Sequence, residues 1–155
     1  ITIVTLLWVS VMEAQRVDKQ FKYHLDRYIE ILENNDIPVP ENQYMIYSVD
    51  KLYSTHLVGV ARGMFTPMFV HIIISPKFSY LDYEKRAWVI YHELTHDIFN
   101  IRHGEIDLME KVIPEYLDDM RLNRAMKELV RYLKDGYDWT RLMSDQRTLE
   151  RLKKL

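Results

Sequence analysis

The chain has 155 residues and a mass of 18.8 kDa, the size of one ordinary domain and too small for two domains with separate cores. Its formal net charge of -2 leaves no basic surplus to neutralise a phosphate backbone, so a nucleic-acid partner is not expected. Because the chain has no cysteine, disulfide frameworks and thiolate metal sites are excluded, and any bound metal must be held by His, Asp or Glu.

The first predicted elements are an apolar N-terminal run and a helix. The run at 1–9, ITIVTLLWV, is shorter than the roughly 20 residues that cross a bilayer. It is therefore interpreted as a buried strand or helix start, and the alternative is the remainder of a membrane or signal segment. Within 9–35, apolar positions recur every three or four residues: Val17, Phe21, His24, Leu25, Tyr28 and Leu32. This spacing predicts a helix with one core-facing stripe.

Three runs rich in β-branched and aromatic residues follow, and they predict strands at 43–49, 57–61 and 69–75. Residues that favour turns separate the runs. Pro67 and Pro76 bracket the third run, as they would bracket an edge strand.

A second helix is predicted over 83–99, where apolar residues again follow a helical spacing. At its start, Ser79 and Asp82 can form a capping box. At its end, Asn100 suits the left-handed conformation that terminates many helices.

A third helix is predicted from Pro114 to about Lys134, because proline suits the first helical position. Glu115 would then place negative charge in the first turn, together with Asp118 and Asp119. The charged segment at the C-terminus also has helical spacing, and 137–155 is predicted to be an appended docking helix for this domain or for another chain. The whole order predicts one α+β domain over 1–155, with a small mixed or antiparallel sheet.

One sequence motif carries chemistry. Residues 92–96 read His-Glu-Leu-Thr-His, an HExxH sequence inside the predicted helix. Residues four apart share a helix face, so His92 and His96 can bind one ion while Glu93 projects beside it. A zinc ion held in this way acidifies a water, and a neighbouring carboxylate can take the proton during attack on a carbonyl. The alternatives are a histidine pair without metal and a metal site without catalysis.

A catalytic zinc normally has three protein ligands, and two residues compete for the third position. His103 lies just past the predicted helix end, where a left-handed Asn100 would fold the chain back toward the ion. Glu115 is the rival, with Asp119 placed to orient a histidine. Because the helix dipole already explains a carboxylate at Glu115, His103 is favoured.

The segment HELTHDIFNIRHG resembles the zincin metallopeptidases, and His103 places it nearer to the metzincins than to the gluzincins. Phe99 stands where metzincins have glycine, and the loop to the third histidine is one residue longer. The segment is more similar to compact HExxH proteins of bacteria and their phages, which read HELxHxxxxxxH. Those proteins carry a Leu-Met or Ile-Met pair soon afterwards. Here the pair is Leu108-Met109, which resembles a Met-turn, although ordinary packing also explains a methionine there.

The resemblance implies a zinc-dependent peptidase in which His92, His96 and His103 hold Zn2+ and Glu93 is the general base. By analogy with zincins, the strand at 69–75 would border the cleft and pair with substrate. The competing hypothesis is a catalytically silent zincin-like module that joins a larger assembly, such as a phage or cell-envelope assembly.

The expected partners are a peptide or protein substrate and a protein bound through the C-terminal helix, whereas a membrane partner is not expected. The chain is expected to be soluble, in a compartment that the sequence leaves open. His24, His56 and His71 are expected to be packed or surface histidines. Asp97 is expected to be solvated or to cap, and Tyr116 is a candidate oxyanion partner.

Overall fold

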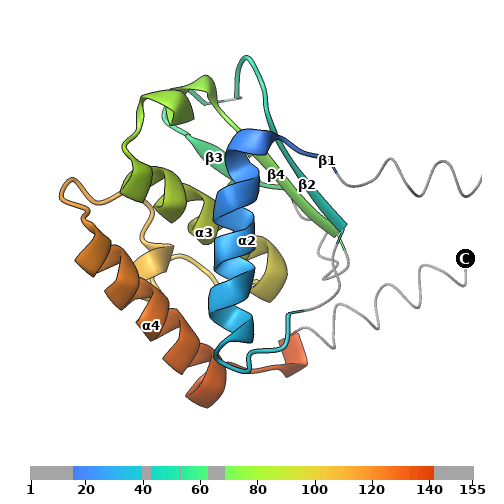
Figure 1. Cartoon of the computed structure of the whole chain (residues 1–155), viewed down its shortest axis with the longest axis vertical. Helices are drawn as coiled ribbons and strands as arrows, with labels where there is room; N and C mark the ends of the chain where they lie inside the picture. The colour runs from blue at the N-terminus through green and yellow to red at the C-terminus, as the bar shows by residue number, and fades with distance from the viewer. Residues whose placement is uncertain (1–15, 40–42, 53, 63–68, 142–155) are drawn as a thin grey trace, which may run out of the picture.

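The computed structural model describes residues 16–39, 43–52, 54–62 and 69–141, and it confirms the predicted α+β class (Figure 1). In chain order, the elements are β1 (Arg16–Val17), α2 (Lys19–Glu33), β2 (Gln43–Ser48), β3 (Gly59–Ala61), β4 (Phe69–Ile74), the 3-10 helix η1 (Pro76–Tyr80), α3 (Tyr83–Phe99), the 3-10 helix η2 (Asp107–Met109) and α4 (Asp119–Asp135).

The strands form one mixed sheet in the order β1-β2-β4-β3. β1, β2 and β4 are parallel, whereas β3 runs antiparallel to β4 and lies at the edge. The prediction that 69–75 is an edge strand is therefore wrong, because β4 pairs with neighbours on both sides. It pairs with β2 along Phe69–Ile74 and with β3 along Ile72–Ile74. Pro76 lies outside the ladder, in η1, and Pro67 lies outside the described residues.

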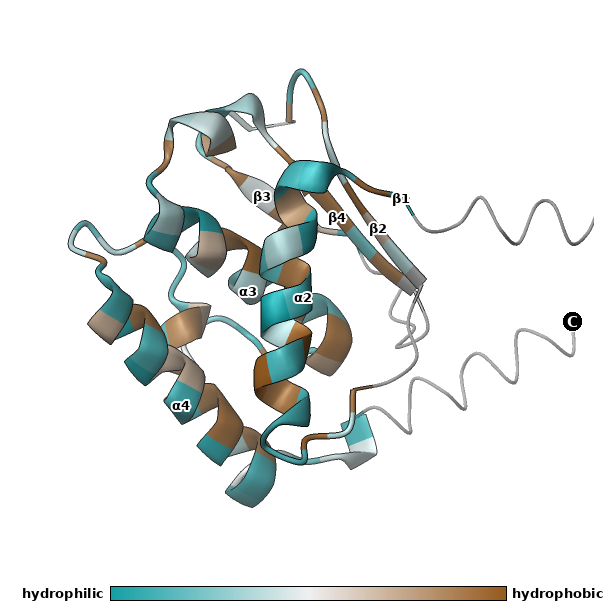
Figure 2. Cartoon of the chain, in the orientation of Figure 1, coloured by the Kyte–Doolittle hydropathy of each residue, from teal (hydrophilic) through white to brown (hydrophobic). Residues whose placement is uncertain are grey.

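The helices are stacked against one side of the sheet, and α3 lies between the sheet and α4 (Figure 1). Val70, Ile72 and Ile74 alternate along β4 and are fully buried. Apolar residues recur along α2 and α4 as the brown bands of Figure 2, and most of the buried residues of the two helices are apolar. The stripe predicted for the first helix is confirmed, since Phe21, His24, Leu25, Tyr28 and Leu32 are the buried residues of α2.

The start of α3 differs from its prediction, whereas its end agrees. Asp82 is the N-cap residue and accepts a hydrogen bond from the Lys85 N–H at 3.0 Å. The predicted capping box is wrong, because Ser79 lies in η1 and donates to the Pro76 carbonyl. Asn100 adopts the predicted left-handed conformation, with φ 52° and ψ 36°.

The start of α4 was also predicted wrongly. Pro114 and Glu115 lie in the preceding loop, and the helix begins at Asp119, after Asp118 caps it by accepting from the Arg121 N–H at 2.8 Å. A side-chain cap satisfies an orphan helix donor, which a proline at the first position does not. Gly136 is the C-cap residue of α4.

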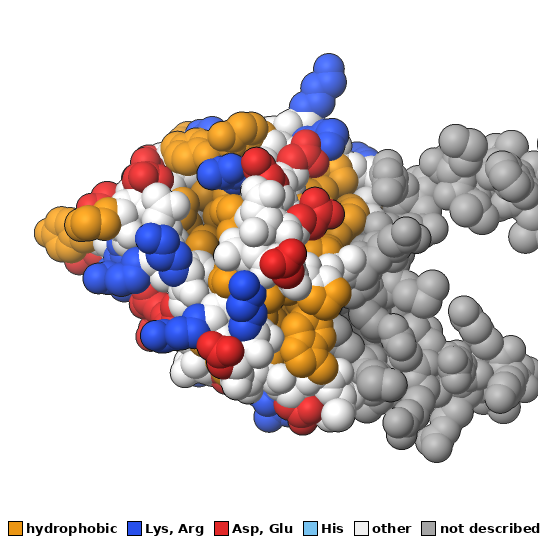
Figure 3. Space-filling model, turned by 60° about the horizontal axis from the view of Figure 1, so that its bottom comes forward, with side chains coloured by type: hydrophobic (Ala, Val, Ile, Leu, Met, Phe, Trp, Pro, Cys, Tyr) orange, Lys and Arg blue, Asp and Glu red, His pale blue; other side chains and the backbone are white. Residues whose placement is uncertain are grey.

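Within the described part of the chain, no helix combines the length and the apolar character needed to cross a bilayer. On the face shown in Figure 3, acidic and basic side chains are interspersed among apolar ones. The predicted apolar run at 1–9 and most of the predicted helix at 137–155 lie outside the described residues.

Candidate metal centre and active site

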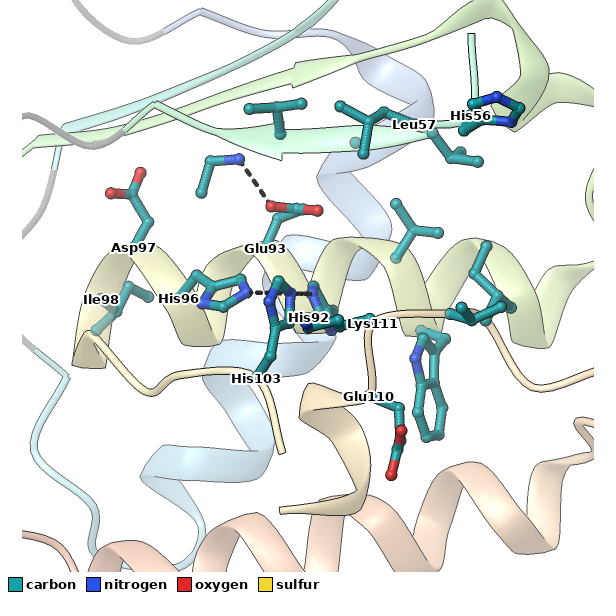
Figure 4. A pocket seen from close by; sticks show the side chains of 18 of the residues that line it. His56, Leu57, His92, Glu93, His96, Asp97, Ile98, His103, Glu110 and Lys111 are labelled. Atoms are coloured by element: carbon teal, nitrogen blue, oxygen red, sulfur yellow. Dashed lines mark hydrogen bonds between the residues drawn. The ribbon is translucent and has the colours of Figure 1, made fainter. Parts of the chain in front are cut away.

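Three imidazoles converge at the C-terminal half of α3 (Figure 4). The Nε2 atom of His103 lies 3.2 Å from Nε2 of His92 and 3.0 Å from Nε2 of His96. Each histidine can offer one nitrogen, and these three atoms lie within 4.8 Å of one another. The three residues differ in burial: His92 is buried, His96 is half-buried and His103 is exposed.

The loop after α3 brings His103 back to the helix. The left-handed Asn100 ends α3, and Gly104 continues the reversal with a φ of 80°, a conformation that glycine adopts without strain. Glu105 then fixes the loop, because its carboxylate accepts from the Arg102 N–H at 2.8 Å and from the Tyr132 hydroxyl at 2.6 Å. The third histidine is thus tied to α4 through Glu105.

Backbone carbonyls set the tautomers of the two helical histidines. His92 Nδ1 lies 2.8 Å from the Leu108 carbonyl oxygen, so Nδ1 carries the proton and Nε2 presents its lone pair. His96 likewise bonds to the backbone at Ile101. Leu108 belongs to η2, next to Met109, and both residues are fully buried. Carbonyl partners of this kind orient histidine ligands in metal sites.

The donor set fits a cation. Two lone pairs point at the His103 Nε2 atom, which carries at most one proton and so cannot satisfy both. A tetrahedral zinc ion with Zn–N bonds of about 2.1 Å holds its nitrogen ligands about 3.4 Å apart. The observed separations of 3.0 and 3.2 Å are close to that value. His92, His96 and His103 are therefore the residues that could hold a metal ion.

Electrostatics also favour the metal-binding form of the histidines. Burial, together with the neighbouring His96 and His103, lowers the pKa of His92 to about 4, and the Leu108 carbonyl opposes this shift. Burial and His103 likewise lower the pKa of His96. Both imidazoles are thus neutral at physiological pH, which metal coordination requires.

Glu93 projects from α3 toward β3 (Figure 4). Its Oε2 atom accepts a hydrogen bond from the Ala61 N–H at 2.7 Å, and the residue is only 8% exposed. Burial, together with the nearby Asp97, raises the pKa of this carboxyl to about 7, and the Ala61 N–H opposes this shift. A carboxylate with a pKa near neutrality suits a general base.

A cleft of about 800 Å³ contains the three histidines and Glu93 and runs along β3 (Figure 4). Apolar residues form part of its lining, among them Leu57, Val60, Trp88, Val112 and Ile113. The cleft therefore combines a candidate ion site, a buried carboxylate and the strand at the edge of the described sheet.

The other proposed site residues lie elsewhere. Glu115 and Tyr116 are exposed in the loop before α4, and neither is among the described residues that line the cleft.

Asp97 does line the cleft, and its carboxylate accepts from the His71 N–H at 2.7 Å. The expectation that Asp97 is solvated or caps a helix is wrong, because this half-buried side chain binds the central strand β4. Its burial raises the pKa of the carboxyl to about 7.

The remaining histidines agree with their predicted packed or surface roles. His24 is buried on α2, and His71 is half-buried, with its Nε2 atom 3.0 Å from the Tyr47 hydroxyl. His56 is exposed at the end of the cleft.

Sequence reasoning missed Gly59 and Ala61. A side chain at Gly59 would place its Cβ atom 3.0 Å from Glu93 Cγ, and Ala61 acts through its backbone. The one available signal was the glycine inside the strand prediction at 57–61, since a strand glycine often marks a close approach. Comparison of the chain with protein-family models, curated proteins and solved structures gives no match.

Proposed function

We propose that this chain is a zinc-dependent peptidase with a zincin-like domain. The observation that carries the proposal is the convergence of three imidazole nitrogens beside one buried carboxylate, within a cleft along a sheet edge. A third histidine from a different segment distinguishes this arrangement from a chance pair of histidines on a helix.

His92, His96 and His103 would hold the ion, and three nitrogen ligands leave a fourth position open, as in catalytic zinc sites. Zinc bound there would supply Lewis-acid chemistry, polarising a peptide carbonyl and acidifying water. The backbone carbonyl of Leu108 keeps the His92 ring in its ligating tautomer throughout.

Glu93 is the residue suited to move the proton. Ala61 occupies its Oε2 atom, so Oε1 is the oxygen that can accept a proton from an attacking water. As the carbon–nitrogen bond breaks, the same oxygen can pass that proton to the departing amine. Its raised pKa suits both transfers, since the group must gain and lose a proton at neutral pH.

An extended peptide is the substrate that the cleft favours. β3 is an edge strand beside the cleft, and an unpaired edge can accept a peptide as an additional strand. The apolar side chains of Trp88, Val112 and Ile113 would contact side chains of that peptide. The HExxH helix, the histidine beyond its end and the edge strand along the cleft together support the zincin-like assignment.

The test is Glu93→Gln, which keeps the shape of the side chain and removes the base. We expect the variant to retain zinc, measured by elemental analysis, and to lose cleavage of a diverse peptide library, measured by mass spectrometry. Glu115→Gln is the matched control and is expected to retain both properties. An active Glu93→Gln variant would refute the role of Glu93, whereas zinc-loaded wild-type chain that cleaves no peptide would favour the silent binding module.

A further inference from the structure

We propose that β3 positions the general base: the Ala61 N–H holds one oxygen of the Glu93 carboxylate, and Gly59 provides the space beneath the strand through which the Glu93 side chain passes. This inference rests on the proposed peptidase function and adds two positioning residues to it, neither of which belongs to the HExxH sequence.

The register of β3 shows why the Ala61 N–H is available. The Arg62 N–H donates to the His71 carbonyl, and the Val58 carbonyl accepts from the Ser75 N–H. Backbone groups of successive residues in a strand point to opposite sides, so Ala61 directs its N–H away from β4, toward the edge of the described sheet. An outward donor at a sheet edge would ordinarily bond to water or to another strand. Here it bonds to Glu93 at 2.7 Å.

Gly59 is the second residue of β3 that positions Glu93. A Cβ atom at this position would lie 3.0 Å from Glu93 Cγ and 3.0 Å from Val89 Cγ1, closer than the ordinary contact distance of about 3.5–4.0 Å. Any side chain at position 59 would therefore push β3 away from α3 or displace Glu93. The absence of a side chain lets the helix and the strand approach closely enough for the Ala61 contact.

These two contacts fix one carboxylate oxygen and leave the other for the proton. A base held in place before the reaction does not have to reorganise during it, which is the usual advantage of a preorganised site. The same N–H is then not available to a peptide, so a substrate strand on β3 would pair through the Gly59 backbone and the Ala61 carbonyl.

The first test needs no catalytic activity. Amide hydrogen exchange, followed by NMR, is measured for Ala61 and for Val60, whose N–H points to the β4 side and reports on the ladder. We expect Glu93→Ala to speed exchange at Ala61 at least roughly tenfold and to leave Val60 unchanged, while Glu93→Gln, which keeps an acceptor oxygen, retains the protection. Equal exchange at Ala61 in wild type and Glu93→Ala would overturn the proposal.

The second test removes the donor. Ala61→Pro deletes the N–H without deleting a ladder hydrogen bond, because an edge-strand proline is tolerated where the N–H faces outward. Loss of a hydrogen bond to a charged group predicts a fall in kcat of about 10- to 100-fold, with KM and zinc stoichiometry preserved. Ala61→Gly keeps the N–H and should rescue most of the lost kcat.

Unchanged kcat in Ala61→Pro would overturn the positioning role. If zinc-loaded wild-type chain cleaves no peptide, the peptidase proposal fails, and the exchange measurement still decides whether Ala61 holds Glu93. The two failures are therefore distinguishable.

Discussion

Substitution of Gly59 by alanine tests the close approach of β3 to α3. The added Cβ atom would meet Glu93 Cγ and Val89 Cγ1 at 3.0 Å and Ile74 Cδ1 at 3.2 Å. Taken alone, the methyl group would stabilise the fold. Its burial would raise the free energy of unfolding by about 0.8 kcal/mol, and replacing a flexible strand glycine would raise it by about 0.5–1 kcal/mol. Overpacking of a closed site costs about 1–3 kcal/mol, and three short contacts place Gly59→Ala toward the upper end of that range.

The net expectation is a fall of about 1 kcal/mol in the free energy of unfolding. Guanidinium denaturation measures it, and kcat should fall as well, because Glu93 is one of the displaced residues. Gly136→Ala is the matched control, since its Cβ atom would lie 3.4 Å from the Tyr132 ring, an ordinary contact. That control should not lower the free energy of unfolding and should raise it by up to about 1 kcal/mol. A Gly59→Ala variant with wild-type stability and wild-type kcat would refute the reasoning.

Two further predictions concern the interior and its response to pH. Thr95→Val removes the acceptor of the buried Tyr28 hydroxyl, 2.8 Å away, and should lower the free energy of unfolding by about 1–3 kcal/mol. Addition of Tyr28→Phe should then cost less than it does in wild type, whereas additive costs would contradict the pairing. Burial, assisted by Arg86, lowers the pKa of His24 below 6.5, so the unfolded chain takes up this proton first and stability is lost as the pH falls below 6.5. His24→Leu should therefore lose less stability than wild type between pH 7.5 and pH 5 in guanidinium denaturation, and an equal loss would argue against a buried neutral His24.

The features predicted correctly from the sequence are those that local spacing determines. The apolar stripe of α2 follows from a periodicity of three or four residues, and a helix around the HExxH sequence places His92 and His96 on one face. Asn100 belongs to this group too, because asparagine tolerates the left-handed conformation that reverses the chain toward His103. The convergence of the three histidines thus follows from one helix and its end.

The features predicted wrongly depend on contacts between distant segments. The position of β4 inside the sheet results from pairing with β2 and β3, and the flanking prolines carry no information about that pairing. The helix starts differ from the prediction because other residues supply the N-cap hydrogen bond: the Asp82 side chain caps α3, and the Asp118 side chain caps α4. The role of Asp97 also depends on a distant segment, because its hydrogen-bond partner on β4 lies 26 positions away along the chain.

The central claim is that His92, His96 and His103 together hold one zinc ion. Elemental analysis of the chain, purified without chelator and equilibrated with zinc, tests it most directly. We expect about one zinc per wild-type chain, loss of the metal in His103→Ala and full occupancy in Glu115→Ala. A wild-type chain that binds no zinc, or a Glu115→Ala variant that loses zinc while His103→Ala retains it, would contradict the claim.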